Sequence, residues 1–330
     1  MHLTIAMLTY RRNEYLAQVI PQLLEQADDV SGPDATAGVL IVDNDPQAGA
    51  RAVVEAARAA LGSDPAESLE PLGEDDSAVS ALTSRLVYVH EPEPGIVAGR
   101  NRALSEARGS DALVFIDDDE IPSPGWLASL VSTWRSQECA AVTGPTPPTF
   151  EDTPSPWVTA SGAFDSWEAA DGAQVRSADT GNLLLDLGVV ERLGLRFDPR
   201  YGLTGGEDSL FTRQLTRAGG VIRFAAGAVV TKRVPAARAR RTWVLERSLR
   251  SGSSWARVRI DTVGPAGDGA SGRLARLRLR LGYGAKGLAK AGIDGARAGV
   301  ARIRGDVPAQ ARYEVSSRGG LGMVVGALGG

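Results

Sequence analysis

The sequence contains one cysteine, two histidines and no long hydrophobic run, and each shortage excludes a class of protein. Cys139 has no second cysteine for an internal disulfide, so we expect a small buried hydrophobic side chain there and a cytoplasmic protein. His2 and His90 are too few for a histidine-rich zinc site, and without a Gly-x-Ser-x-Gly turn they argue against a Ser-His-Asp triad. The apolar runs fall far short of the roughly 18 residues that a membrane span needs. The first residues lack a basic region and a long apolar stretch, so we expect no secretory signal.

A glycine-rich phosphate-binding loop is also missing. The first strand-like run, residues 3–8, is followed by Thr9-Tyr10-Arg11-Arg12 rather than by a Walker sequence or a dinucleotide fingerprint. This argues against P-loop enzymes and classical dehydrogenases. What is present is a globular composition, with 43% hydrophobic and 23% charged residues among 330, which excludes wholesale disorder and fibrous repeats.

The charge is distributed unevenly along the chain. Residues 232–330 contain 20 Lys and Arg against 6 Asp and Glu, a net of +14, whereas residues 1–231 contain 16 basic and 34 acidic side chains, a net of −18. A basic region after an acidic one indicates an anionic partner, such as membrane headgroups or phosphate. A solvated helical face whose arginines pair with the acidic region explains the asymmetry equally well.

Short apolar runs alternate with helical patterns in the first half of the chain. The expected strands cover residues 3–8, 39–42, 86–89 and 112–116, and the expected helices cover residues 13–27, 49–61, 96–107 and 124–135. Pro21 is expected to kink or divide the first helix. Residues 62–84, rich in Glu, Asp and Pro, predict a mobile acidic insertion. Apolar strands that alternate with helices predict an α/β fold with a parallel sheet covered on both faces.

Polar and acidic side chains follow the ends of the expected strands. Thr9 and Tyr10 come after the first strand, Asp43 after the second, and Asp117 and Asp118 after the fourth. Ligands of such sheets bind outside the carboxyl ends of the strands, so we expect these residues along one edge. An edge with this many carboxylates would repel itself unless a cation lies there.

Asp117-Asp118-Asp119 is the sharpest local motif. Adjacent carboxylates offer the hard oxygen ligands that Mg²⁺ and Mn²⁺ prefer, and diphosphate oxygens can fill the remaining positions. A metal there would offset the negative charge that develops on a phosphate leaving group. Taken alone, the motif is equally consistent with an acidic turn that leads through Glu120 and Pro122 into the next helix.

The second acidic motif, Gly205-Gly206-Glu207-Asp208, directly precedes an amphipathic helical pattern. Carboxylates in the first turn of a helix are stabilised by the helix dipole, so simple capping explains the motif by itself. A carboxylate at a helix entrance that faces a cleft can instead act as a general base.

Taken together and in order, these motifs closely resemble family 2 glycosyltransferases of the GT-A fold, nearest to bacterial exopolysaccharide enzymes of the succinoglycan glucosyltransferase type. The ordered set is far more specific than any one motif, and it extends over residues 3–235. The matching stretches are residues 8–12, 42–45, 93–95, 115–120, 144–145, 180–182 and 204–208.

The resemblance implies a GT-A-type doubly wound, mostly parallel sheet in residues 1–235 and a basic helical region in residues 236–330. It implies an inverting enzyme that moves a hexose from a nucleotide-diphosphate sugar, taken to be UDP-linked, to a saccharide or lipid-linked acceptor, with Mg²⁺ or Mn²⁺ as cofactor and no nucleic acid partner. Asp208 matches the general base, Glu207 steers the acceptor hydroxyl, and Asp119 matches the metal ligand. The residues matched to the nucleotide-sugar pocket are Thr9, Tyr10, Asp43, Arg100, Asp117 and Asp118.

The chain departs from the family pattern at the strand-like residues 229–233. Many relatives carry a histidine or an acidic residue there to complete the metal shell, whereas this chain has Thr231 and Lys232. A protonated lysine is no metal ligand, so either water completes the coordination or the metal binds weakly.

The basic region gives two further expectations. Arg247 and Arg250 lie three residues apart, on one face of an expected helix. Relatives carry a basic motif at this place that closes over the diphosphate. A basic helix exposed to solvent explains the two arginines equally well. Residues 272–304 alternate Lys and Arg with Leu, Ala and Gly, and we expect them on the inner face of the cell membrane, beside lipid-linked acceptors. The apolar stripe of this segment consists of Leu274, Leu277, Leu281 and Leu288.

Two other functions remain open on the sequence. A sugar nucleotidyltransferase also uses a metal and an α/β sheet, but it needs a basic glycine-rich loop after the first strand. Arg11-Arg12 resembles such a loop only weakly. A non-catalytic module that binds nucleotide sugars needs no base, so the presence of both Asp119 and Asp208 argues against it.

Overall fold

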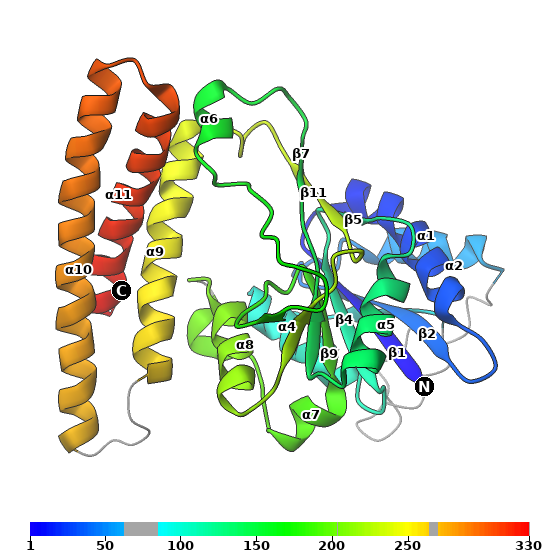
Figure 1. Ribbon diagram of the computed structural model, residues 1–330. Coiled ribbons are helices and arrows are strands. Elements are labelled where there is room, and N and C mark those ends of the chain that lie inside the picture. Colours follow the sequence, from blue (N-terminus) through cyan, green and yellow to red (C-terminus); the bar gives the residue numbers. More distant parts are fainter. Residues whose placement is uncertain (63–84, 203, 264–269, 330) are drawn as a thin grey trace. The chain divides into compact units, whose positions relative to one another are not determined.

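The computed structural model describes residues 1–62, 85–202, 204–263 and 270–329 (Figure 1). The predicted acidic insertion, residues 62–84, lies outside this part of the chain except for its first residue. Two compact units make up the described chain. The first unit contains residues 1–147, 166–203 and 211–232, and the second contains residues 148–165, 204–210 and 233–330.

An eight-stranded, mostly parallel sheet forms the centre of the first unit, in the order β3-β2-β1-β4-β9-β6-β10-β8. β1 pairs in parallel with β2 and β4, β2 with β3, and β6 with β10, whereas β9 runs antiparallel to β4 and β6, and β8 antiparallel to β10. The predicted α/β class with a mostly parallel sheet is confirmed. The strands are β1 (His2–Thr9), β2 (Thr36–Asp43), β3 (Leu86–His90), β4 (Ala112–Asp117), β6 (Ala141–Thr143), β8 (Gln174–Val175), β9 (Asn182–Asp186) and β10 (Ile222–Phe224).

Helices cover both faces of this sheet. One core cluster joins the strands to α1 (Asn13–Val30), α2 (Arg51–Ala60) and α5 (Trp126–Gln137); the other joins them to α4 (Ile96–Glu106), α7 (Leu187–Arg192) and the later turns of α8 (Glu207–Arg217). Val114 belongs to the first cluster and its neighbour Phe115 to the second, because successive side chains of a strand point to opposite faces. Apolar residues at every strand position therefore predict helices on both sides.

Pro21 was expected to kink or divide the first helix, α1; the helix runs through Pro21 without a break, so the expected division is wrong. Pro21 lies on the exposed face of the helix, where water can bond the carbonyl that loses its amide partner. The buried face carries Leu16, Val19 and Leu23, which pack on the sheet as the apolar spacing predicts.

A second, smaller pairing in the first unit lies next to the end of β4. β5 (Glu120–Pro122) runs antiparallel to β11 (Val230–Val234), and the register places Lys232 opposite Glu120. This pairing brings the strand that departs from the family pattern to the acidic motif. A short 3₁₀ helix, η1 (Pro199–Tyr201), precedes the loop to α8.

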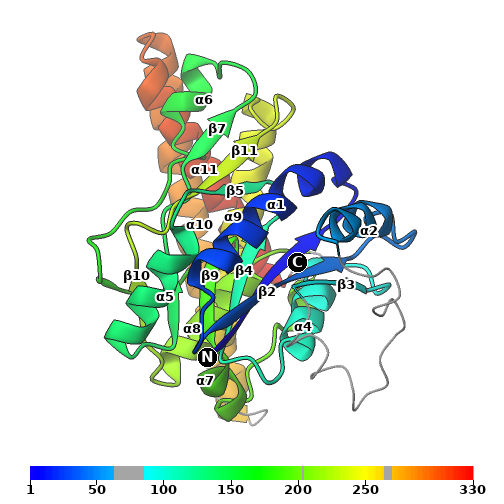
Figure 2. The same ribbon diagram turned by 90° about the vertical axis from the view of Figure 1, so that its right-hand side faces the viewer.

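Three long helices lie side by side in the second unit, α9 (Arg241–Val263), α10 (Ala270–Ile303) and α11 (Val307–Leu328) (Figures 1 and 2). Glycines of α11 allow its close approach to α9: a Cβ on Gly322 would lie 2.0 Å from Leu249 O, and one on Gly326 would lie 2.2 Å from Ser253 O. β7 (Pro148–Phe150) and α6 (Pro156–Ala160) belong to the same unit. Among the described helices, none combines the length and the apolarity that a membrane span requires.

Candidate functional site

The carboxyl ends of β1, β2, β3 and β4 lie level with one another. In the sheet register, Thr9 pairs with Asp43, Asp43 with His90, and Leu8 with Asp117. The polar edge predicted from the sequence is therefore assembled within the first unit, from residues far apart in the chain.

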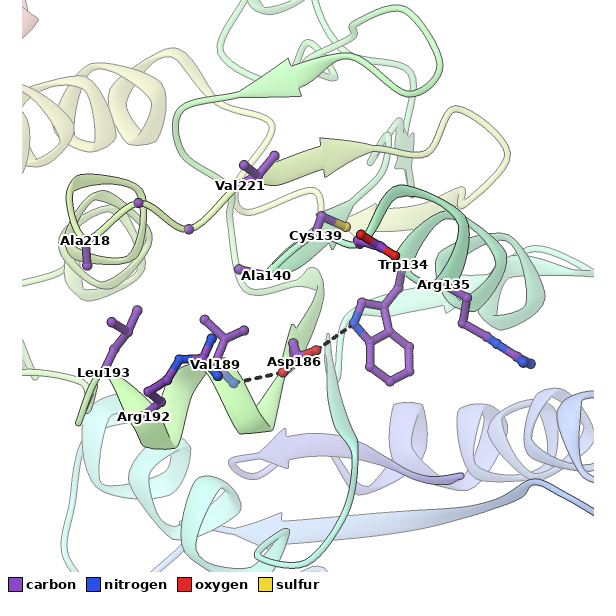
Figure 3. Close-up of a pocket in the computed structure, with 13 residues that line it drawn as sticks. Trp134, Arg135, Cys139, Ala140, Asp186, Val189, Arg192, Leu193, Ala218 and Val221 are labelled. Carbon is purple, nitrogen blue, oxygen red and sulfur yellow. Dashed lines mark hydrogen bonds between the residues drawn. The ribbon is translucent and has the colours of Figure 1, made fainter.

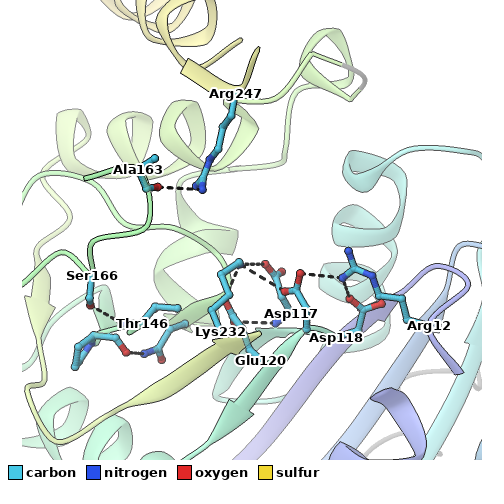
Figure 4. Close-up of polar contacts among 12 residues, drawn as sticks. Arg12, Asp117, Asp118, Glu120, Thr146, Ala163, Ser166, Lys232 and Arg247 are labelled. Carbon is cyan, nitrogen blue, oxygen red and sulfur yellow. Dashed lines mark hydrogen bonds and ion pairs between the residues drawn. The ribbon is translucent and has the colours of Figure 1, made fainter. Parts of the chain in front are cut away.

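Asp118 joins the end of β1 to the end of β4. Its carboxylate accepts hydrogen bonds from Thr9 Oγ1 at 3.1 Å and from Tyr10 N at 3.3 Å, and it forms an ion pair with Arg12 (Figure 4). Arg12 Nη1 also lies 3.1 Å from Asp119 Oδ2. Burial raises the pKa of Asp118, and the charge of Arg12 opposes that rise. Arg12 was not among the residues expected at the site from the sequence; its place three residues after β1 is the signal that could have found it.

Asp117, Asp119 and Glu120 form a compact group, which we call the carboxylate cluster. One carboxylate oxygen of each lies within 4.8 Å of the others. Lys232 Nζ lies 2.9 Å from Glu120 Oε1, 3.3 Å from Asp117 Oδ2 and 3.5 Å from Asp119 Oδ1 (Figure 4). A cation that the acidic edge was expected to require is therefore supplied by the chain itself.

The pKa values of Glu120 and Lys232 are both raised, but by different causes: burial raises that of Glu120, and the neighbouring carboxylates raise that of Lys232. Glu120 is 1% exposed, and burial raises its pKa to about 8 although Lys232 opposes the rise. Burial lowers the pKa of Lys232, but the charges of Glu120, Asp117 and Asp119 outweigh burial and hold the pKa above its ordinary value. Lys232 is thus a cation at neutral pH. The three oxygen donors fit Mg²⁺ or Mn²⁺ in their chemistry, and a lysine ammonium already contacts all three.

The Thr180-Gly181-Asn182 motif supports the carboxylate cluster from the start of β9. A Cβ on Gly181 would lie 2.6 Å from Glu120 Oε1, so only glycine lets the backbone pass this carboxylate. Asn182 donates to Ala228 O at 2.7 Å and accepts from Trp126 Nε1 at 2.9 Å. The motif therefore holds together the segments around the carboxylate cluster, a role that the sequence did not reveal.

Asp43 is completely buried at the end of β2. Its Oδ1 accepts from Asp45 N at 2.9 Å, and its Oδ2 accepts from Ala50 N and Tyr88 Oη at 2.9 Å each. The carboxylate thus orders the turn after β2, and a nucleotide base would have to share its oxygens with these donors.

Arg100 lies on α4, beneath the end of β4. It is 4% exposed, with its guanidinium 5.6 Å from the ring centroid of Phe197 and 4.0 Å from Asp117 Oδ1. A third cation of the first unit therefore borders the acidic edge, next to Lys232 and Arg12.

Glu207 and Asp208 open α8, as expected for carboxylates in a first helical turn. Glu207 is buried, and Asp208 Oδ1 accepts from Ser209 N at 2.5 Å. Both residues belong to the second unit, whereas the carboxylate cluster belongs to the first.

The loop before Glu207 packs on α9. Gly205 and Gly206 have φ values of 75° and 94°, which favour glycine, and a Cβ on Gly206 would lie 2.8 Å from Ser254 Cβ. Thr204 O accepts from Ser254 Oγ at 3.2 Å, and Thr204 Oγ1 accepts from Arg257 Nη1 at 2.7 Å. The two glycines are therefore needed for the close contact with α9, and Ser254 and Arg257 position the loop in a way that the sequence did not indicate.

Arg247 and Arg250 lie on α9 in the second unit. Arg247 donates to Ala163 O at 3.2 Å (Figure 4). Its guanidinium lies over the rings of Phe164 and Trp243. Arg250 is exposed. The predicted basic pair thus has one member packed against aromatic rings and one facing solvent.

A cavity of about 600 Å³ lies at the other end of the strands, away from the carboxylate cluster (Figure 3). Asp186 borders it and pairs with Ala112 at the start of β4, far from the carboxylate cluster. Asp186 accepts from Trp134 Nε1 at 3.0 Å and from Val189 N at 2.8 Å, which caps α7. Cys139, also in the lining, is buried as expected, and burial raises the pKa of its thiol to about 11. The polar groups named here serve the fold.

The chain is similar to known proteins in both sequence and fold. Residues 4–172 match the family model described as Glycosyl transferase family 2. The chain is 32% identical over 259 residues to the succinoglycan biosynthesis protein ExoM of Rhizobium meliloti (strain 1021). The matched residues cover 78% of this chain and 75% of that protein. Among solved structures, S. aureus TarS 1-349 has a TM-score of 0.50 at 11% identity, covering 96% of this chain and 91% of that one. The structural likeness shows a shared fold.

Proposed function

The chain belongs to glycosyl transferase family 2, and from this premise we propose that it is an inverting enzyme that moves a hexose from a UDP-sugar to a saccharide or lipid-linked acceptor. As a family 2 glycosyltransferase it uses a nucleotide sugar, and the similar Rhizobium meliloti protein is named for succinoglycan biosynthesis. Synthesis of a cell-surface polysaccharide is therefore the proposed setting. The observation that carries the proposal is the acidic edge at the ends of β1 and β4, where family motifs of the first unit come together.

We assign the donor pocket to the edge where β1 to β4 end. Tyr10 follows β1 with 52% of its surface exposed, so its ring is available to stack on a base. Thr9 fixes Asp118 through its hydroxyl, and Arg100 places a positive charge beside Asp117. Asp43 contributes by ordering the turn after β2.

Asp119 is assigned as the principal metal ligand, with Asp117 and Glu120 as further oxygen donors of the carboxylate cluster. When bound, Mg²⁺ or Mn²⁺ supplies positive charge that stabilises a leaving diphosphate. Arg12 holds Asp118 and Asp119 in place through its ion pairs.

Asp208 is assigned as the general base, and Glu207 as the residue that steers the acceptor hydroxyl. Asp208 lies in the first turn of α8, and in this assignment its carboxylate accepts the acceptor's proton. The acceptor oxygen then attacks the anomeric carbon from the face opposite the diphosphate, which inverts the configuration without a covalent intermediate. Arg250, with Arg247 beside it on α9, is assigned to the diphosphate.

The experiment is UDP release from UDP-hexoses in the presence of Mn²⁺, with and without saccharide acceptors. Asp208→Asn should keep UDP binding in calorimetry but lose transfer by about 10²- to 10⁴-fold, the usual contribution of a general base. Asp198→Asn, which alters a capping aspartate paired with Arg200, is the matched control and should transfer normally.

The same assay separates the other candidates. Production of pyrophosphate from UTP and a sugar phosphate would replace this proposal with a nucleotidyltransferase. UDP-sugar binding without any turnover would replace it with a binding module. Normal turnover by Asp208→Asn would remove the base assignment alone.

For the basic region, we propose that α10 lies on an anionic membrane surface at the cytoplasmic face. The apolar stripe of this helix is exposed, with 49% at Leu274, 65% at Leu281 and 61% at Leu288. At 3.6 residues per turn, the stripe spans about 60° of the helix. Basic side chains flank it, as on helices that bind anionic lipid. The flanking residues are Arg273, Arg280, Lys286, Arg297 and Arg302.

The membrane proposal is tested by co-sedimentation with phosphatidylglycerol-containing vesicles and with phosphatidylcholine vesicles. We expect binding to the anionic vesicles only, and its loss in Leu281→Asp/Leu288→Asp. Leu321→Asp, an exposed leucine on α11, is the control and should bind as the unaltered protein does. Equal pelleting of the double variant would overturn the proposal.

A further inference from the structure

Lys232 contacts every member of the carboxylate cluster. Its ammonium lies 2.9 to 3.5 Å from one oxygen of Glu120, Asp117 and Asp119. The antiparallel register of β5 and β11 fixes this position, because it sets Lys232 directly opposite Glu120. The lysine side chain is 32% exposed, so ions and ligands can reach it from solvent.

The charges at this edge are nearly balanced by the chain alone. Four consecutive carboxyl groups, residues 117–120, face three cations: Lys232, Arg12 and Arg100. Counting these seven groups alone, the sum is −1 with all four carboxyl groups ionised and 0 with the buried Glu120 protonated. A divalent ion added to the donor-free protein would make the sum positive and would lie next to the Lys232 ammonium, because both need the same oxygens.

A nucleotide diphosphate reverses this balance. Its phosphate oxygens bring negative charge and accept the hydrogen bonds that the lysine ammonium now gives to carboxylates. The flexible four-carbon stem of Lys232 allows the ammonium to turn toward phosphate without moving β11. A metal can then take the place of the ammonium among the carboxylate oxygens that Lys232 contacts.

We propose that Lys232 determines when metal binds: it occupies the cation position of the donor-free protein and excludes divalent ions until a nucleotide diphosphate takes up its ammonium. This inference rests on the proposed function for the identity of the diphosphate. It concerns a residue that ligates no metal, and it predicts that metal binding depends on nucleotide through that residue.

The test is a titration of Mn²⁺ into the full-length donor-free protein, with free Mn²⁺ measured by electron paramagnetic resonance. Lys232→Met removes the ammonium and keeps much of the side-chain volume. We expect it to bind Mn²⁺ at least about tenfold more tightly than the unaltered protein, since a neighbouring positive charge is gone. Adding UDP should strengthen Mn²⁺ binding by the unaltered protein at least about tenfold, and much less in Lys232→Met.

Two further variants separate charge from shape. Lys232→Arg keeps the charge and should bind Mn²⁺ as weakly as the unaltered protein without UDP. Arg192→Met removes an exposed cation on α7, outside the cluster, and should leave Mn²⁺ binding unchanged. If Lys232→Met does not fold, the unaltered protein and Lys232→Arg still decide the question, because tight Mn²⁺ binding by either without UDP overturns the proposal.

Equal Mn²⁺ affinity of the unaltered protein and Lys232→Met, within about twofold, would also overturn it. The donor-free titration involves no sugar transfer, so its outcome is independent of the UDP-release assay. A protein that turns over no UDP-sugar, but gains Mn²⁺ affinity in Lys232→Met, would retain the lysine's role and lose the proposed function.

Discussion

Replacing Asn182 with alanine should strongly destabilise the first unit. Asn182 is 1% exposed, and its amide nitrogen donates to Ala228 O at 2.7 Å and to Pro145 O at 3.3 Å. Its amide oxygen accepts from Trp126 Nε1 at 2.9 Å. Alanine removes all three bonds and leaves the indole N–H of the completely buried Trp126 without its acceptor.

The magnitude follows from the groups left behind. A buried donor or acceptor without a partner costs about 1–3 kcal/mol, and here the Trp126 N–H and the Ala228 carbonyl both lose a short hydrogen bond. The longer bond to Pro145 adds less. We expect the free energy of unfolding to fall by about 3–5 kcal/mol, a large share of the roughly 5–15 kcal/mol that stabilises a typical domain.

Urea unfolding followed by circular dichroism measures this loss. Trp126→Phe removes the indole N–H, so the double variant should show a favourable coupling of at least about 1 kcal/mol. A loss below about 1 kcal/mol for Asn182→Ala would refute the reasoning, because it would mean that water or a rearrangement satisfies the freed groups.

Three further predictions concern the carboxylate cluster and the packed helices. Gly181→Ala forces a Cβ against the Glu120 carboxylate and should cost about 1–3 kcal/mol of unfolding free energy, with weaker UDP binding in calorimetry; an unchanged melting temperature would contradict this. Folding raises the pKa of Glu120 from its ordinary value of 4.5 to about 8. The free energy of unfolding should therefore fall as the pH rises from 4.5 to 8, by at most about 1.4 kcal/mol per pH unit from this group. Urea unfolding measured across this pH range should show a smaller fall for Glu120→Gln. Gly322→Val should separate α11 from Leu249 and lower the thermal midpoint of helix melting, whereas Gly292→Val, with open space around it, should lower it far less.

The first four strands could be predicted because their signals are local. Unbroken apolar runs mark them in the sequence, and the structure extends each by only a few residues, as in β1 (His2–Thr9) against the expected 3–8. The second half of the sheet gave no such signal. β6, β8, β9 and β10 are two to five residues long, and β9 owes its antiparallel place to pairing with β4 and β6 on either side.

The glycines show the same limit. The sequence indicated that Gly205 and Gly206 allow a tight approach, but not that the approach is to Ser254 on α9. From the sequence, Gly181 was only a member of a family motif. The structure shows that Glu120 lies against it and leaves no space for a Cβ. A sequence shows where a glycine lies, but it does not show which atoms of other residues occupy the space that a side chain would fill.

The sequence by itself determined the fold class, the carboxylates that follow a buried strand, and the order of motifs that marks the family. Only the tertiary structure decided which cations face those carboxylates. Lys232 is 112 residues from Glu120 along the chain, and Arg12 is 106 residues from Asp118. Electrostatic interactions depend on distance in space, and the pairing of strands from distant parts of the chain sets that distance.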